Sequence, residues 1–318
     1  MRDYSAIAQY ILKTLAYFDI FRYPLKKEEL KNRLPITCSD AVFEYVLKTL
    51  SAHRKIYEYR GFWLYSEKPD LVERRIHGNK MASETLPKAK KIAQRIGRFP
   101  FVEAVFVSGS LSKDYMDAKS DIDFFIITTP SRLWTCRTLL TLFKKVFLLN
   151  QKKHFCINYF IDTQHLEIPD KNQFTATEIN FLLPLYGKKT CAAFFDANSW
   201  VRSYYHQPGY LRTTTAPLVK KTLQLKTENW LHRPIFDGLE NWCLRMTQEY
   251  RKRKFKKQLS QQFEVNMRSK EGVSKHHPTG FQFKVMKAFE ERCEAIDQAS
   301  LDALFSPGNT YETSYSKK

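Results

Sequence analysis

The chain has 318 residues, enough for two or three domains, and its 43% hydrophobic and 14% aromatic content excludes a disordered protein. No run approaches the roughly 20 apolar residues of a membrane-spanning helix, so we expect a cytoplasmic protein with no membrane partner. The formal charge of +19 implies attraction to polyanions, such as nucleic acid, nucleotide phosphates or an acidic partner. Six scattered cysteines without a Cys-x-x-Cys pair argue against a zinc ribbon and a disulfide framework.

The first 68 residues predict three helices followed by a β-hairpin. Apolar residues at helical spacing mark a helix over Tyr4–Phe21, a second runs over Lys26–Leu34, and a third starts near Ser39. Ile56–Tyr65 then has the pattern of a hairpin that turns at Arg60-Gly61. This order of elements resembles a winged helix.

The third of these helices would enter the major groove if the domain read DNA. However, Asp40 and Glu44 occupy outward positions on it, and carboxylates that face a phosphate backbone are unfavourable. We therefore favour a docking or substrate-shaping module, and a winged-helix regulator remains the last-ranked alternative.

After a basic helix predicted over Asp70–Phe99, the chain reaches the stretch that organises it. One apolar run ends in Gly109-Ser110, and a second is preceded by Asp121 and Asp123. Short apolar runs bounded by turn residues are typical of buried strands. Asp121 and Asp123 are two residues apart, so on a strand they project from the same face.

Ionised carboxylates at the head of a buried strand are costly unless a cation compensates them. Two hard oxygen ligands on one face suit Mg²⁺, which takes one or two carboxylates and completes its shell with water and phosphate. Gly109 lets the backbone approach a ligand closely, and the amides and the Ser110 hydroxyl that follow can receive phosphate oxygens.

These residues resemble a known signature. Gly109-Ser110, a short polar helix with Ser112-Lys113 where relatives often carry Ala-Arg, and then Ser120-Asp121-Ile122-Asp123 entering a strand are similar to the motif of the polymerase-β-like nucleotidyltransferase superfamily. The resemblance implies a small mixed sheet with flanking helices. It also implies transfer of a nucleoside monophosphate from a nucleoside triphosphate, with release of pyrophosphate.

The resemblance assigns roles to particular residues. Asp121 and Asp123 would be the catalytic residues and would hold Mg²⁺ or Mn²⁺. Gly109, Ser110, Lys113 and Ser120 would bind the donor, which we expect to be ATP. The acceptor stays open among RNA, a small molecule such as a sugar or an antibiotic, and a protein side chain.

A helix over Arg132–Leu149 and a third strand over His154–Asp162 complete a mixed α/β sheet with helices packed on it. Relatives usually carry a third carboxylate on this strand. Parity places five residues on one face, namely His154, Cys156, Asn158, Phe160 and Asp162. Asn158 can ligate a metal but cannot act as a base, and Asp162 reaches the site only if the register allows. A nucleotide- or RNA-binding module with weakened or lost catalysis is therefore the alternative.

The remaining sequence predicts mostly helices. Gln173–Leu185 is expected to be a helix, and Pro217–Phe263 is expected to be helical with an interruption near Pro234. Lysines and arginines crowd the second half of that segment, which is either a polyanion clamp or a solvated helix face. A final helix is predicted over Gln282–Leu304.

His276 and His277 fall in a predicted loop, Ser274–Pro278, and adjacent side chains point apart on regular structure, so a histidine metal site is not favoured. Together these elements predict an α/β protein with three parts. They are a winged-helix-like domain (1–68), a nucleotidyltransferase domain with its leading helix (69–205) and a basic helical C-terminal region (206–318). The oligomeric state is left open.

Overall fold

The computed structural model describes residues 4–147, 155–207, 209, 222–236, 238–254, 268–275 and 280–306. The chain forms two compact units, one of residues 1–76, 202–207 and 284–318 and one of residues 77–201 and 208–283. The three-part division expected from the sequence stays a prediction. Within the described ranges, no helix is long and apolar enough to cross a membrane.

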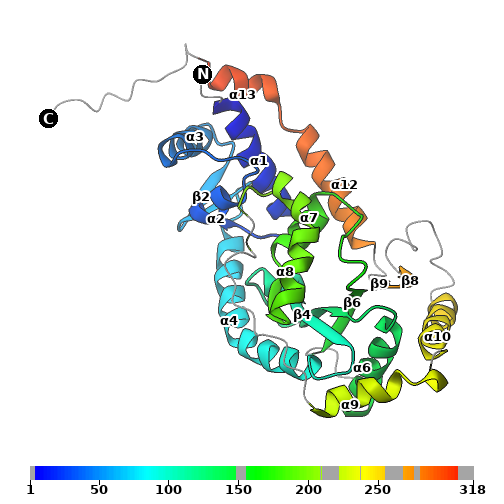
Figure 1. The fold of residues 1–318 in the computed structure, drawn as a ribbon. Helices are drawn as coiled ribbons and strands as arrows, with labels where there is room; N and C mark the ends of the chain where they lie inside the picture. The colour runs from blue at the N-terminus through cyan, green and yellow to red at the C-terminus, as the bar shows by residue number, and fades with distance from the viewer. Residues whose placement is uncertain are drawn as a thin grey trace. The chain divides into compact units, whose positions relative to one another are not determined.

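The first unit packs helices around a three-stranded antiparallel sheet with the order β1-β3-β2 (Figure 1). Buried side chains at helical spacing, among them Ile11 and Leu15 of the first helix and Phe43 of the third, form its core. Its elements are α1 (Tyr4–Ile20), β1 (Leu25–Lys26), α2 (Lys27–Asn32), α3 (Asp40–Ala52), β2 (Tyr57–Tyr59), β3 (Phe62–Leu64), the start of α4 (Asp70–Ile96), most of α12 (Phe281–Glu294) and α13 (Gln298–Leu304).

The predicted hairpin is confirmed, and its turn has a local cause. Arg60 and Gly61 both have positive φ, +52° and +77°, as a two-residue turn between twisted strands requires. Strand β1 is not expected from the sequence, which predicts that Lys26 begins a helix. Leu25 and Lys26 instead pair with Trp63 and Phe62, and only this long-range pairing makes them a strand. The winged-helix interpretation stays a prediction.

The second unit contains a six-stranded sheet with the order β7-β4-β5-β6-β9-β8 (Figure 1). β5 and β6 are parallel and the other neighbours are antiparallel, so the predicted mixed sheet with flanking helices is confirmed. Its strands are β4 (Val102–Ser108), β5 (Asp123–Thr128), β6 (Cys156–Asp162), β7 (Leu183–Tyr186), β8 (Ser269–Lys270) and β9 (Val273–Lys275). The helices that follow residue 96 are α5 (Gly109–Ser112), α6 (Leu133–Phe147), α7 (Gln173–Asn180), α8 (Lys188–Ala197), the 3₁₀ turn η1 (Ser199–Ser203), α9 (Thr222–Leu231), the 3₁₀ turn η3 (Pro234–Phe236) and α10 (Leu239–Lys254).

Alternating side chains of the central strands bury both faces of this sheet. Val105 and Phe124 belong to a core that also takes in buried residues of α4 and α6, such as Ala93 and Trp134. On the opposite face, the ring of Phe194 from α8 contacts the rings of Phe106 and Phe125, 5.5 and 5.2 Å away. Both faces are covered, which explains why β4 and β5 are almost wholly apolar.

Three predicted elements are wrong in part. The helix expected over Gln173–Leu185 ends at Asn180, and Leu183–Tyr186 forms edge strand β7, where Pro184 is tolerated. Ser274 and Lys275, expected in a loop, belong to β9 and pair with β6. The single C-terminal helix is two helices, because the Asp297 side chain caps a new start by accepting from the amide of Ala299. His276 and His277 lie outside the described residues.

Candidate functional site

The bend after β4 lies directly against the first residue of β5. Ser108 is the register partner of Asp123, so the next residue, Gly109, meets the Asp123 side chain. Gly109 has φ +69°, and a Cβ at this position would clash with Asp123 Oδ2. A glycine is therefore needed here for both its backbone conformation and its small size.

Asp123 is the electrostatic centre of the site. Its Oδ1 accepts a hydrogen bond of 2.8 Å from Nδ2 of Asn158. Burial raises the pKa of Asp123 from 3.8 to about 6, and the negative charges of Asp121 and Glu178 add to the rise. Asp121, two residues earlier, is half-buried just before the strand begins. Two neighbouring carboxylates, one of them largely desolvated, make a place where a cation would be stabilised.

Cys156 and Asn158 share a face beside Asp123, as parity predicts, but a bulge in β6 breaks the alternation after them. Phe124 pairs with Ile157 but Phe125 pairs with Tyr159, so Asn158 is an extra residue in the strand. The alternation expected over this strand therefore does not continue to Asp162, and His154 lies outside the described residues.

The same register excludes Asp162 as the third ligand. Asp162 pairs with Thr128, five residues along β5 from Asp123, which is about 16 Å at the rise of a strand. Asp162 is buried and holds Nδ1 of His165 at 2.7 Å instead.

Lys113 lies at the site and is already paired. Its Nζ is 2.9 Å from a carboxylate oxygen of Glu178 and donates to the carbonyl of Gly109 at 3.1 Å. Glu178, on α7, is a site residue that sequence reasoning missed, because nothing in its predicted helix distinguishes it from a surface glutamate. Lys113 and Glu178 together brace the Gly109 bend.

The two serines of the motif have local partners. The Ser120 hydroxyl donates to Asp117 Oδ1 at 2.9 Å and closes the turn that leads into Asp121. The Ser110 hydroxyl contacts the sulfur of Met116 at 3.6 Å. Ser120 directly precedes Asp121 in the chain, and Ser110 directly follows the Gly109 bend.

The carboxylates of this site fit part of the coordination shell of Mg²⁺. Among the described residues, no group of three His, Cys, Asp or Glu side chains could enclose a metal. Asp121 and Asp123 supply two carboxylates, and Mg²⁺ needs no more when phosphate and water complete its octahedron. Oδ1 of Asn158 accepts from the thiol of Cys156 at 3.2 Å, so in this arrangement Asn158 positions Asp123 rather than offering a free ligand.

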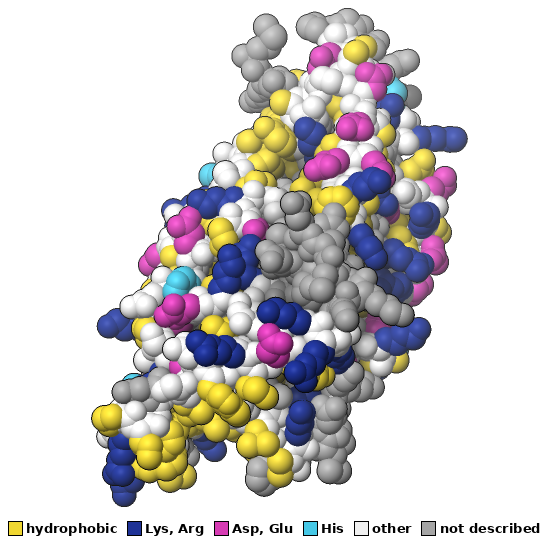
Figure 2. All heavy atoms as spheres, turned by 90° about the vertical axis from the view of Figure 1, so that its right-hand side faces the viewer, with side chains coloured by type: hydrophobic (Ala, Val, Ile, Leu, Met, Phe, Trp, Pro, Cys, Tyr) yellow, Lys and Arg dark blue, Asp and Glu magenta, His cyan; other side chains and the backbone are white. Residues whose placement is uncertain are grey.

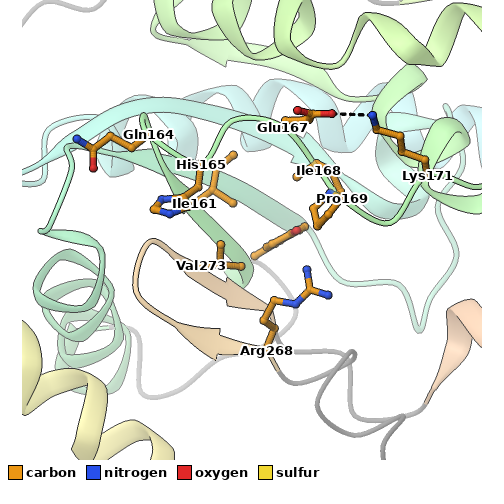
Figure 3. Close-up of a pocket in the computed structure, with 10 residues that line it drawn as sticks. Ile161, Gln164, His165, Glu167, Ile168, Pro169, Lys171, Arg268 and Val273 are labelled. Atoms are coloured by element: carbon orange, nitrogen blue, oxygen red, sulfur yellow. Dashed lines mark ion pairs between the residues drawn. The ribbon is translucent and has the colours of Figure 1, made fainter.

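A pocket of about 580 Å³ lies further along the same sheet, over β6 and β9 (Figure 3). Tyr159, Ile161 and Val273 give it apolar walls, and His165 and Arg268 give it polar groups. The Tyr159 ring lies 5.1 Å from that of Phe125, which is two residues after Asp123. The pocket therefore lies beyond the carboxylate site, toward the C-terminal end of β6.

One half-buried carboxylate, that of Asp170, pairs with the cations beside this pocket. Asp170 lies 3.3 Å from the guanidinium of Arg268 and 3.6 Å from Nζ of Lys275. Burial lowers the pKa of Lys275, while the negative charges of Asp170 and Glu178 oppose that change. Since two cations share Asp170, the pocket suits a ligand that carries a negative group.

No family model matches this sequence, and the comparisons with curated proteins and with solved structures found no significant match. The function must therefore be argued from the geometry of the site.

Replacing Gly109 tests how tightly the bend and Asp123 are packed. Gly109→Ala is expected to lower the free energy of unfolding by about 2–3 kcal/mol, because the added Cβ combines φ strain with a clash. Gly61→Ala is the matched control, since Gly61 also has positive φ but nothing lies within 4 Å of its Cβ position. Chemical denaturation measures both, and equal losses would contradict the proposed contact with Asp123.

Proposed function

We propose that the protein is a metal-dependent nucleotidyltransferase similar to the polymerase-β-like superfamily. The observation that carries this proposal is the contact of Asp123, at the head of a buried strand, with the positive-φ bend at Gly109. Asp121 and Asp123 would hold Mg²⁺ or Mn²⁺, which supplies neutralisation of the charge that develops on a transferring phosphoryl group. The region around Gly109 would seat the phosphates of ATP or another triphosphate.

The chain's own contribution is positioning. A hydroxyl or amine of the acceptor would form a bond to the α-phosphorus while the bond to pyrophosphate breaks. Because the amide of Asn158 cannot take up the acceptor's proton, that proton would be lost to solvent water. Lys113 would leave its ion pair with Glu178 when the donor binds, and its positive charge would then lie near the phosphates. The pocket over β6 has the size of a small-molecule site and would take the non-reacting part of a substrate.

Asn158 favours a second candidate, a nucleotide-binding module whose catalysis is weakened. This module would bind a triphosphate with Mg²⁺ and release it unchanged. If Asn158→Asp created turnover where the wild-type protein has none, the second candidate would be supported. Turnover by the wild-type protein would exclude it.

The test supplies labelled triphosphates, Mg²⁺ or Mn²⁺, and candidate acceptors to the wild-type protein and to Asp121→Asn/Asp123→Asn. We expect label transfer by the wild-type protein only, since the double variant keeps the shape of the site and loses its charges. A calorimetric titration with a non-hydrolysable triphosphate and Mg²⁺ gives a readout that needs no acceptor. Equal transfer or equal donor affinity for both proteins would contradict the proposal.

A further inference from the structure

Large apolar side chains are exposed along one side of α10. Trp242, Met246 and Tyr250 follow one another at four-residue spacing, with 57%, 54% and 61% of their surface exposed. Trp230 on α9 and Ile235 in η3 are exposed too, at 50% and 83%. Figure 2 shows hydrophobic side chains at the lower end of this face of the molecule, with Lys and Arg next to them. An exposed apolar surface of this kind marks an interaction site.

The exposed charges around this surface are mostly positive. The exposed ionised side chains of 222–236 and 238–254 include one carboxylate, Glu249. The exposed cations of these ranges are Lys226, Arg233, Arg245, Lys252, Arg253 and Lys254. An ordinary solvated helix face mixes both signs, so this excess needs a different explanation.

Two other acids of these helices serve the core. Glu228 is buried and accepts from the amide of Phe101 at 2.7 Å. Glu240 accepts from the first amides of α6, those of Trp134 and Thr135, at 2.7 and 2.9 Å. Because these acids face inward and the cations face outward, the outer side of α9 and α10 is complementary to a polyanion.

Large apolar and charged side chains alternate along one side of α10. Arg245, Glu249 and Arg253 lie three residues after Trp242, Met246 and Tyr250 in turn, hence on the same side of the helix. Nζ of Lys254 lies 5.5 Å from the centre of the Tyr250 ring. Cations would contact phosphates, while exposed indole and phenol rings would stack on bases.

We propose that the outer face of α9 and α10 binds single-stranded nucleic acid. Bases in a duplex are stacked on each other and offer no free ring face. The exposed rings of Trp242 and Tyr250 therefore favour an unpaired strand. The inference is independent of nucleotidyl transfer, because the face carries none of the residues assigned to donor or metal.

The test measures the binding of labelled oligouridine and oligothymidine of about 16 nucleotides, and of a duplex of equal length, by fluorescence anisotropy at about 50 to about 200 mM salt. Trp242→Ala/Tyr250→Ala should weaken single-strand binding by about tenfold or more. Arg253→Gln/Lys254→Gln should reduce the slope of log affinity against log salt by about 1.4. Glu249→Gln should strengthen binding, because it removes an exposed negative charge that would repel the phosphates.

The controls separate this surface from the rest of the protein. Tyr59→Ala removes an exposed ring in the other unit and should leave the affinity unchanged. Asp121→Asn/Asp123→Asn should bind the strand as the wild-type protein does, even if it loses all transfer.

Several outcomes would overturn the proposal. They are the absence of strand binding at the lowest salt, equal affinity for duplex and single strand, or an affinity that the aromatic variant leaves unchanged. If light scattering shows that the wild-type protein is a dimer and that Trp242→Ala is a monomer, the face would instead bind a second copy of the chain.

Discussion

Asp123→Asn is expected to abolish transfer and yet make the metal-free protein more stable at pH 7, by about 1–3 kcal/mol. The physical reason is that burial and the charges of Asp121 and Glu178 raise the pKa of Asp123 to about 6, so its ionised form is costly in the folded state. An amide of the same shape removes that charge and can still accept the hydrogen bond from Asn158.

The sign of the pH dependence follows from the same shift. The folded-state pKa of about 6 lies above the ordinary value of 3.8, so the folded protein binds this proton more tightly than the unfolded chain. The resulting stabilisation is fully present below about pH 4 and is lost as the pH rises through about 6. The metal-free wild-type protein should lose this contribution across that window, and Asp123→Asn should not.

Thermal unfolding in a chelator and then in excess Mg²⁺ measures both effects. Mg²⁺ should stabilise the wild-type protein, because a ligand that binds only the folded state adds to stability. It should leave the stability of Asp123→Asn unchanged. Asp196→Asn, at an exposed position on α8, is the control and should change the free energy of unfolding by less than about 0.5 kcal/mol. A variant less stable than the wild-type protein at pH 7 would contradict the electrostatic account of the site.

Glu29→Gln is expected to destabilise the first unit by about 3 kcal/mol, because it breaks a buried ion pair. Arg75 is 2% exposed, and its guanidinium donates to both carboxylate oxygens of Glu29, at 2.8 and 3.3 Å, and to the carbonyl of Pro24 at 2.8 Å. Its guanidinium carbon also lies 3.7 Å from the centre of the Tyr23 ring. Without the carboxylate, the buried guanidinium of Arg75 loses the negative charge that it pairs with at 2.8 Å.

The matched control is Glu73→Gln. Glu73 pairs with Arg60 at the surface, where more than half of each side chain is exposed, and such pairs contribute at most about 1 kcal/mol. Chemical denaturation of both variants gives the comparison, and equal losses would contradict the role of the buried pair.

A pH series provides a second check on Glu29. Burial raises its pKa, but the charges of Arg33 and Arg75 outweigh this effect, so the pKa lies below the ordinary 4.5. The stability that this shift contributes is present above pH 4.5 and is lost as the pH falls through the folded-state pKa. The difference between Glu29→Gln and the wild-type protein should therefore shrink in acid.

Local sequence patterns predicted the elements whose partners lie close by in the chain. The hairpin at Arg60-Gly61 and the two strands around the Gly109 bend follow from turn residues and apolar runs within a few positions. Strands β1 and β7 were not predicted, because each pairs with a strand that is distant in the chain. The Ser274-Lys275 strand, expected as a loop, pairs with the adjacent β8 as well as with the distant β6. Short segments carry little propensity of their own, so tertiary pairing decides them.

The sequence by itself determined that Asp121 and Asp123 are two residues apart at the head of a buried strand and close to a glycine bend. It could not determine what else reaches them. The bulge at Asn158 and the approach of Glu178 depend on strand register and helix packing, which arise from contacts among residues far apart in the chain. For the same reason, only the tertiary structure placed Asp162 at the opposite end of the sheet and turned Glu228 and Glu240 inward.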